Sequence, residues 1–399
     1  MHKLDAYLLP AVITCLFLLF PALPLSGESS GAPKGIYFQD GVTMRNGEQY
    51  RAMGINYNNC FSSVIRDADN RDFVDGFRIL KEDYNIPYIR FMACSFDHRG
   101  WQLYVDDPEE HFRRLDLIVR EAEKRGLGLI PSLFWYVVAV PDLMNEPLSA
   151  LGDADSASRE FIRQYTTEVV TRYKDSPAIY AWEVGNEYLL YVDLPEYDHL
   201  PPPKAGSGQP RTKEDKLFRP MIMDLYKDFY ETVRAIDEHR IIVTGDSVPR
   251  AHAWHNRNKD AWGLDTREQW LEQFKADTPE PYQVVSFHLY AEADGEYFKG
   301  EKPSLEEFTR IISEFCREQG KAIWCGELGM PGYDSESRDL FFRMMNTVEE
   351  NKMDLSAIWN FIPHGTYQTE WDITPDNERS FMLDAVVEMN ERFAIGDWK

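Results

Sequence analysis

Two glutamates stand where a buried segment of the chain comes to its end. Glu187 closes the apolar run AIYAWEVGNE (178–187), and Glu327 lies near the end of KAIWCGELG (321–329). A carboxylate at the end of a buried strand costs free energy unless it is paired or has a function. Five further side chains with polar groups interrupt apolar runs in the same way: Arg90, Asn186, His288, Tyr290 and Trp359.

Paired carboxylates suit the hydrolysis of a glycosidic bond. When they lie about 5 Å apart, one attacks the anomeric carbon of a sugar, while the other protonates the leaving oxygen and later deprotonates water. A gap of roughly 6.5–9.5 Å leaves room for a water molecule and leads to inversion instead. The distance between the two carboxylates therefore distinguishes hydrolysis with retention from hydrolysis with inversion.

The elements that must position these residues alternate along the chain. Apolar runs predict eight strands, at 51–57, 87–93, 126–135, 178–187, 240–246, 282–290, 321–329 and 355–362. Amphipathic stretches predict helices at 71–84, 108–125, 156–173, 214–238, 266–276, 304–319, 335–351 and 379–393. Apolar strands joined by helices are typical of a parallel sheet. Eight such units favour an α/β fold with a single (β/α)8 TIM barrel, whose site lies at the carboxyl ends of the strands. Residues 35–50 precede it as a β-hairpin, with turns at Asp40-Gly41 and Asn46-Gly47.

Four of these segments resemble glycoside hydrolase family 5. They are WEVGNE (182–187), SFHLY (286–290), CGELG (325–329) and IWNF (358–361), and the resemblance extends over nearly the whole mature chain. It implies that Glu187 is the acid/base, with a pKa raised so that it holds a proton at the working pH. It also implies that Glu327 is the nucleophile, kept ionised by Arg90 and the Tyr290 hydroxyl.

The same resemblance implies how the sugar is held. Asn186 would hydrogen-bond the sugar 2-hydroxyl, His288 would position the acid/base and the substrate, and Trp359 would form the floor at the cleavage site. Aromatic loop residues also suit the apolar faces of sugar rings. They are Trp101, Tyr104, Trp135, Tyr136, Tyr191, Trp254, Trp262 and Trp371. Of these, Trp135 and Trp254 are the predicted substrate contacts.

The first functional hypothesis is an endo-acting, retaining hydrolase of a β-1,4-linked polysaccharide, either mannan or glucan. The residues that decide between the two polymers lie in loops 136–155 and 188–213. An exo-acting β-glycosidase or a transglycosidase would use the same site. A barrel that binds carbohydrate without catalysis is the alternative from another class, and the presence of both carboxylates with Arg90, Asn186 and Tyr290 argues against it.

No cofactor is expected, and no metal. His252 and His255 form an H-x-x-H pair after the fifth predicted strand, but no H-x-H ends the first strand and no strand-end lysine is placed to bridge two metals. The formal net charge of −24 disfavours nucleic acid and anionic membranes as partners. A neutral polysaccharide or oligosaccharide is compatible with it, and the oligomeric state is left open.

Residues 1–27 have the layout of a secretory signal peptide. Lys3 precedes an apolar run from Ala6 to Phe20, and cleavage is expected near Ser26 or Gly27. An uncleaved anchor is the alternative. The prediction is thus a secreted protein, extracellular or periplasmic, whose residues 28–399 form one catalytic domain without another membrane segment.

Four cysteines follow the signal segment, and none shows C-x-x-C spacing. Cys60 and Cys94 follow neighbouring strands, so they are the expected pair if an oxidising compartment forms a disulfide. Four free, partly buried thiols are the alternative, with Cys316 and Cys325 as the other two.

Overall fold

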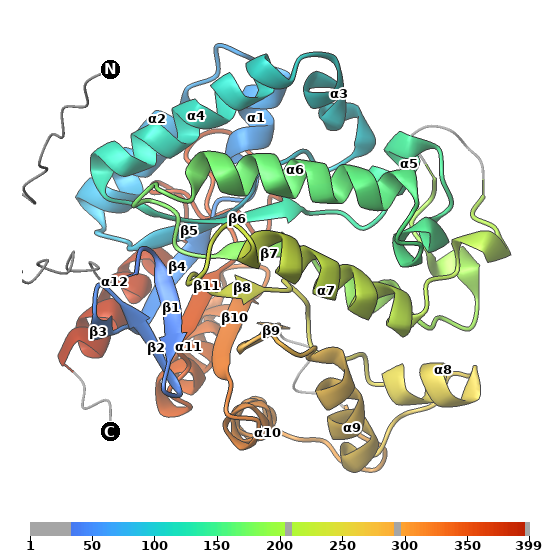
Figure 1. Ribbon diagram of the computed structural model, residues 1–399. Helices are drawn as coiled ribbons and strands as arrows, with labels where there is room; N and C mark the ends of the chain where they lie inside the picture. Colours follow the sequence, from blue (N-terminus) through green and yellow to red (C-terminus); the bar gives the residue numbers. More distant parts are fainter. Residues whose placement is uncertain (1–32, 204–209, 291–296, 396–399) are drawn as a thin grey trace, which may run out of the picture. The chain divides into compact units, whose positions relative to one another are not determined.

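A barrel of parallel strands forms the centre of the computed structural model, which describes residues 33–203, 210–290 and 297–395 (Figure 1). The strands are β4 (Ala52–Asn56), β5 (Tyr88–Met92), β6 (Gly128–Phe134), β7 (Trp182–Gly185), β8 (Ile242–Val243), β9 (Val284–Leu289), β10 (Ala322–Leu328) and β11 (Leu355–Ile358). Each lies within a stretch expected to be a strand, so the predicted (β/α)8 barrel is confirmed. The predicted signal segment lies outside the described residues.

Hydrogen bonds connect the barrel strands in the order β8-β7-β6-β5-β4-β11-β10-β9. Every one of these pairs is parallel, and the pairing of β11 with β4 brings the last strand beside the first. β8 and β9 are the two ends of the order. Between them the Ser286 hydroxyl donates to the carbonyl oxygen of Asp246 at 3.4 Å, and we call this junction the β8/β9 seam.

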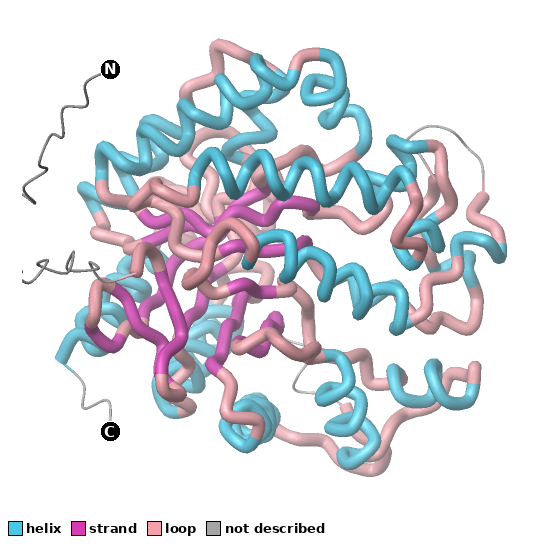
Figure 2. Tube along the Cα trace, viewed as in Figure 1, coloured by secondary structure: helices cyan, strands magenta, loops and turns pink. Residues whose placement is uncertain are grey.

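Helices surround the strands, as the tube in Figure 2 shows. The longer ones are α4 (Pro108–Arg125), α6 (Ala157–Tyr173), α7 (Arg219–Arg234), α9 (Arg267–Asp277), α10 (Leu305–Glu318), α11 (Ser335–Glu350) and α12 (Phe381–Ile395). Local signals fix their ends. In α4, the Asp107 side chain accepts from the Glu110 N–H at 3.0 Å, and the helix stops at Gly126, whose φ is 66°.

Two predicted helices differ in the structure. The stretch 71–84 divides into α2 (Asp72–Arg78) and a π turn, η1 (Ile79–Asp83). The stretch 214–238 becomes α7 only from Arg219, because a 3-10 turn, η5 (Lys213–Asp215), precedes it.

Short helices also occur in loops between the predicted elements. They are α1 (Cys60–Arg66), α3 (His98–Asp106), α5 (Ala139–Met144) and α8 (Ala253–Lys259), with the 3-10 turns η2 (Leu148–Gly152), η3 (Tyr188–Tyr191) and η4 (Tyr197–His199). Helices of one or two turns show too little periodicity to be recognised in a sequence, and they depend on packing for stability.

The predicted N-terminal hairpin is present and gains a third strand. β1 (Ile36–Gln39), β2 (Val42–Arg45) and β3 (Glu48–Gln49) form an antiparallel sheet. Positive φ angles at both expected turns, 52° and 82° at Asp40-Gly41 and 55° and 84° at Asn46-Gly47, match the turns that suit tight hairpins.

This small sheet covers the end of the barrel opposite the strand carboxyl ends. The Ile36 N–H donates to the Tyr180 carbonyl at 2.8 Å, and the Ile36 carbonyl accepts from the Ile241 N–H at 2.8 Å. Ile36 belongs to a hydrophobic cluster that includes Tyr88 and Trp324, both near the starts of their strands. The amino-terminal end is therefore a packed core, and the carboxyl end is left for the site.

Cys60, Cys94, Cys316 and Cys325 are all free and buried. The possible Cys60–Cys94 disulfide is absent, and the alternative of four free thiols holds. Among the described residues, no helix has both the length and the apolar character needed to span a bilayer.

Candidate active site

Glu187 lies in the turn that follows β7. Its φ of 55° is in the left-handed region, which side chains other than glycine rarely adopt. Its N–H donates to the Gly245 carbonyl at 2.9 Å, and a Cβ on Gly245 would lie 2.0 Å from the Gly185 carbonyl oxygen. Only glycine permits that approach. The turn is also held by Asp246, whose carboxylate accepts from the Leu189 N–H at 3.0 Å.

Glu327 comes from β10, at a point where the strand changes register. Between Cys325 and Glu327 the pairing with β9 slips, so that Glu327 lies opposite His288. The carbonyl of the intervening Gly326 accepts from the Asn56 side chain at 2.9 Å, which fixes the irregular segment from the first barrel strand. An irregularity of this kind re-aims a side chain beside a site.

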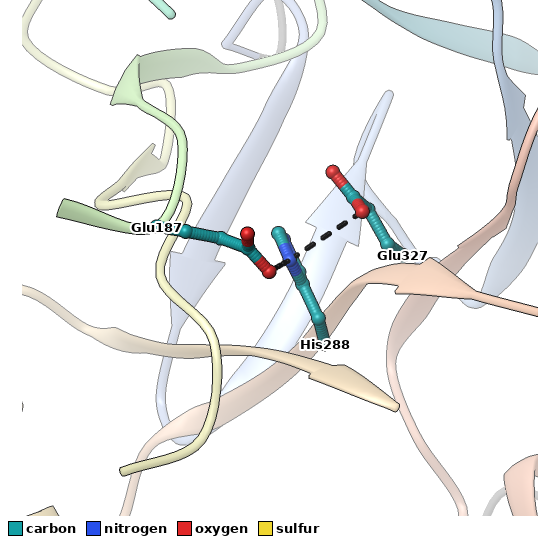
Figure 3. A group of neighbouring side chains, drawn as sticks. All are labelled: Glu187, His288 and Glu327. Atoms are coloured by element: carbon teal, nitrogen blue, oxygen red, sulfur yellow. Dashed lines mark hydrogen bonds and ion pairs between the residues drawn. The ribbon is translucent and has the colours of Figure 1, made fainter. Parts of the chain in front are cut away.

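Glu187, His288 and Glu327 meet at the carboxyl end of the barrel (Figure 3). His288 Nδ1 lies 2.8 Å from Glu187 Oε1 and 3.6 Å from Glu327 Oε2. One ligand atom from each of the three residues lies within 4.8 Å of the other two, so an oxygen of each carboxylate is that close to the other. The hydroxyl of Tyr290 donates to Glu327 Oε2.

Arg90 connects the two strands that carry the carboxylates. Its Nη1 donates to Glu327 Oε1 at 2.7 Å, and its Nη2 donates to Asn186 Oδ1 at 2.8 Å. Its Nε points the other way, with Glu183 Oε1 and Oε2 at 2.8 Å and 2.9 Å. The guanidinium carbon lies 4.5 Å from the centre of the Trp135 ring, over its face. One buried cation thus fixes Glu327 and Asn186 together.

Glu183 is a residue that the sequence reasoning missed. It lies in β7, is completely buried, and also receives the Trp324 indole N–H at 3.4 Å. The signal was available, because a charged residue in the middle of an apolar strand needs a buried partner. Glu183 lies inside its strand and not at the carboxyl end, where the site residues of a barrel are expected.

The contact between Glu187 and His288 shifts their two pKa values in opposite directions. Burial raises the pKa of Glu187, but the hydrogen bond from His288 and the charges of His288 and Arg90 outweigh it, and the pKa falls below its usual value. Burial lowers the pKa of His288, whereas the charge of Glu327 and the hydrogen bond to Glu187 raise it above its usual value. The raised pKa expected for Glu187 is therefore wrong for this arrangement. The proton is shared across the 2.8 Å contact and favours the imidazole.

Burial first, and then the charge of Glu327, raise the pKa of the Tyr290 hydroxyl well above its usual value. Tyr290 therefore stays protonated and serves as a donor to Glu327 at any ordinary pH.

A cavity of about 800 Å³ opens above these residues. Its lining includes all the predicted site residues except Arg90, which lies beneath it, and Trp254. Trp135 and Trp359 line it as stacked rings with centroids 6.1 Å apart, and the Trp359 indole N–H donates to Gln368 Oε1 at 2.8 Å. The floor is aromatic and held in place, as carbohydrate sites require.

The other aromatic loop residues differ in where they lie. Tyr136, Tyr191 and Trp371 line the cavity. Trp101 and Tyr104 are buried in an aromatic cluster around Tyr165, so they are core residues. Trp254 lies on α8, where its N–H donates to Asp265 Oδ2 at 2.8 Å, and the structure does not bring it to the cavity wall.

The two histidines of the H-x-x-H pair lie in different surroundings. His255 Nδ1 lies 2.6 Å from Asp265 Oδ1, while His252 lines the cavity. Among the described residues, the group with the spacing of metal ligands is Glu187, His288 and Glu327. In this group His288 binds Glu187, and the Tyr290 hydroxyl donates to Glu327.

Comparisons with known proteins agree with the fold. Residues 81–365 match the family model described as cellulase (glycosyl hydrolase family 5). The chain is 36% identical over 100 residues to a probable mannan endo-1,4-beta-mannosidase A-1 of Aspergillus terreus. The aligned region covers 23% of this chain and 25% of that protein. It is 33% identical over 144 residues to a probable mannan endo-1,4-beta-mannosidase F of Emericella nidulans, over 32% of this chain and 33% of that protein. The aligned parts thus span a quarter to a third of these relatives.

A solved structure extends the likeness over most of the fold. The endo-1,4-beta-mannanase from Rhizomucor miehei superimposes with a TM-score of 0.64, covering 90% of this chain and 99% of that one at 15% sequence identity. At this identity the likeness is one of fold.

Proposed function

The chain belongs to glycosyl hydrolase family 5, and from this premise we propose that it is a retaining glycosidase that cleaves β-1,4-linked mannan within the polymer. The observation that carries the proposal is the short gap between carboxylates. Oxygens of Glu187 and Glu327 lie within 4.8 Å of each other. This short separation fits direct attack on the sugar by a carboxylate, and it is narrower than the separation typical of inverting enzymes.

In the first step Glu327 attacks the anomeric carbon and forms a covalent glycosyl ester. Arg90 Nη1 and the Tyr290 hydroxyl bind the two oxygens of Glu327, so the carboxylate is aimed before substrate arrives. As the bond to the leaving oxygen breaks, that oxygen takes a proton from Glu187.

Glu187 obtains this proton from His288 across the 2.8 Å contact. A substrate that fills the cavity displaces water around Glu187, and desolvation favours the neutral carboxyl over the anion. In the second step Glu187 takes a proton from water, which attacks the glycosyl ester and releases Glu327.

Binding groups surround the reacting carbon. The carbonyl oxygen of Asn186 is occupied by Arg90, so its amide nitrogen is left to donate to the sugar 2-hydroxyl. Trp359 lies under the sugar, and Trp135 covers Arg90 and extends the same aromatic floor. These roles agree with those implied by the family resemblance.

Mannan is favoured over glucan by the relatives, since both proteins aligned above are described as mannan endo-1,4-beta-mannosidases. Endo action is favoured by the same relatives, whose descriptions name endo-acting enzymes.

The test is release of reducing sugar from mannan, glucomannan, mixed-linkage glucan, carboxymethyl-cellulose and xylan. We expect the highest rate on mannan and loss of all activity in Glu327→Ala. Glu187→Ala should lower the rate by about 10²–10⁴-fold and recover with azide on an activated aryl glycoside. Glu160→Ala, an exposed position on α6, is the matched control and should behave as wild type.

Product analysis separates the alternatives. Oligosaccharides of several lengths at early times support endo action, whereas monosaccharide alone would establish the exo-acting glycosidase. Proton NMR of the first product tests retention of the anomeric configuration. Glu327→Ala with wild-type activity would overturn the assignment, and tight oligosaccharide binding without turnover would establish the binding barrel.

A further inference from the structure

Trp262 is a large aromatic side chain that stays exposed close to the cavity. Its exposed fraction is 44%, although its indole N–H is fixed by Glu196 Oε2 at 2.6 Å. An indole that is both exposed and held in one orientation is unusual, because aromatic side chains of this size normally bury most of their surface.

Neighbouring rings hold the indole from the sides. His199 packs edge-to-face at 5.4 Å between ring centroids, with an interplanar angle of 80°, and His252 does so at 5.8 Å and 84°. The backbone before Trp262 is anchored as well, because the Asn256 side chain donates to the Ala261 carbonyl at 3.1 Å.

Lys216 ties the two chain segments that meet here. Its ammonium donates to the Pro195 carbonyl at 3.0 Å and lies 3.6 Å from the Asp260 carboxylate. Pro195 precedes Glu196, and Asp260 lies two positions before Trp262. The indole and the carboxylate that holds it are therefore fixed relative to each other.

The indole contacts a residue that lines the active-site cavity. His252, whose ring contacts Trp262, also lines the cavity, as does Arg250 from the same loop. Arg250 Nη1 donates to the Leu189 carbonyl at 3.3 Å, and its Nη2 donates to the Val192 carbonyl at 2.8 Å. The loop that carries Arg250 and His252 is thus hydrogen-bonded to the segment after Glu187 and contacts Trp262.

We propose that Trp262 is a stacking platform outside the cavity for a further sugar ring of the β-1,4-linked chain being cleaved. This inference rests on the function proposed above. The apolar face of a pyranose would lie on the indole. The exposed side chains of Glu196 and His199, at 52% and 57%, would hydrogen-bond its hydroxyls.

The platform predicts a dependence on substrate length. A short oligosaccharide fills the cavity alone, so its cleavage gains nothing from Trp262. A longer one gains the stacking contact in the ground state and in the transition state alike, which lowers KM and leaves kcat unchanged.

The experiment compares kcat/KM for wild type and Trp262→Ala on a ladder of β-1,4-mannan oligosaccharides of rising length and on an aryl mannoside. Beyond one length, we expect kcat/KM of the variant to fall about tenfold through KM, a change of about 1.4 kcal/mol. Below that length the two enzymes should agree. Trp262→Phe should recover most of the loss, because a ring face remains.

Phe342→Ala is the matched control, since Phe342 is an aromatic residue on α11 with a similar exposed fraction of 40%. It should not alter the length dependence. Equal kcat/KM for wild type and Trp262→Ala at every length would overturn the platform, as would an equal fall at every length. Neither result affects the proposed hydrolysis, which fails only if the aryl mannoside and all oligosaccharides remain uncleaved by the wild type.

Discussion

The guanidinium of Arg90 is completely buried and binds four side chains at once, those of Glu183, Glu327, Asn186 and Asn56. A planar fork with five donors can do this, whereas a lysine ammonium has one centre and cannot reach both carboxylates in the same geometry. The orientation of Arg90 therefore matters as much as its charge.

Arg90→Lys should impair both stability and activity. Glu183 would remain buried with a poorer partner, so the free energy of unfolding should fall by less than the roughly 3–5 kcal/mol lost when a buried ion pair is broken outright. Denaturant unfolding measures this loss, and kcat/KM on mannan should fall about 10²-fold or more because Glu327 is no longer aimed. Arg78→Lys, at an exposed pair with Asp75 and Asp83, is the control. Wild-type kinetics in Arg90→Lys would show that charge alone suffices.

His288→Gln should alter the pH profile in a defined direction. In the wild type the proton for catalysis is held by a pair in which the pKa of His288 is raised. In the variant the carboxyl of Glu187 must hold it, and the ordinary pKa of a glutamate lies about two units below that of imidazole. The alkaline limb of kcat/KM should therefore move to lower pH. A profile that keeps its position and loses only height would assign His288 a purely structural role.

The site residues at the strand ends could be predicted because each is a polar side chain at the end of an apolar run. Glu187, Glu327, Arg90 and His288 all interrupt apolar runs, and the barrel brings such interruptions to one face. The proton position could not be predicted in this way. It depends on the 2.8 Å contact between two strands and on the charges around it.

At the scale of elements, the described residues of β8 and β9 are not paired with each other at the β8/β9 seam. Two buried carboxyls, those of Asp246 and Asp277, lie beside this seam. Burial raises the pKa of Asp246 to about 6 despite hydrogen bonds from Leu189 and Tyr226. Burial also raises the pKa of Asp277 to about 7, against the charge of Arg219. Protonation of either group therefore favours the folded state.

Asp246→Asn should flatten the dependence of stability on pH. The contribution of protonated Asp246 is fully present below about pH 4 and is lost as the pH rises through about 6, a loss of about 2–3 kcal/mol. The melting temperature of the wild type should thus fall more between about pH 5 and pH 8 than that of the variant. Asp339→Asn, at an exposed position on α11, should leave the wild-type slope. Parallel slopes for wild type and Asp246→Asn would contradict the assignment.

The strands and long helices could be predicted because their apolar periods are strong over many residues. Even the tight turns of the hairpin followed from Asp-Gly and Asn-Gly. The short helices α1, α3, α5 and α8 could not, since tertiary packing decides them. Trp101 shows the same limit among side chains, because a tryptophan in a loop and one in the core look alike in sequence.

At the scale of the whole molecule, the formal charge of −24 disfavours polyanions as partners and is compatible with a neutral polymer. Secretion would bring the protein to such a polymer, and it remains a prediction from residues 1–27.

Expression of the full chain in a secreting host should yield a mature protein that begins close to residue 27. The intact mass of the protein in the medium measures this. Retention of the whole chain in the membrane fraction would instead support the uncleaved anchor.

The four free thiols have a practical consequence for anyone producing this protein. Burial raises the pKa of each one, to about 12 for Cys94, so none of these four offers a reactive thiolate in the native state. Correct folding needs no oxidant, and a reducing bacterial cytoplasm is a suitable host. Heating, by contrast, exposes all four at once, and a reductant in the buffer then decides whether cooling returns active enzyme or cross-linked aggregate.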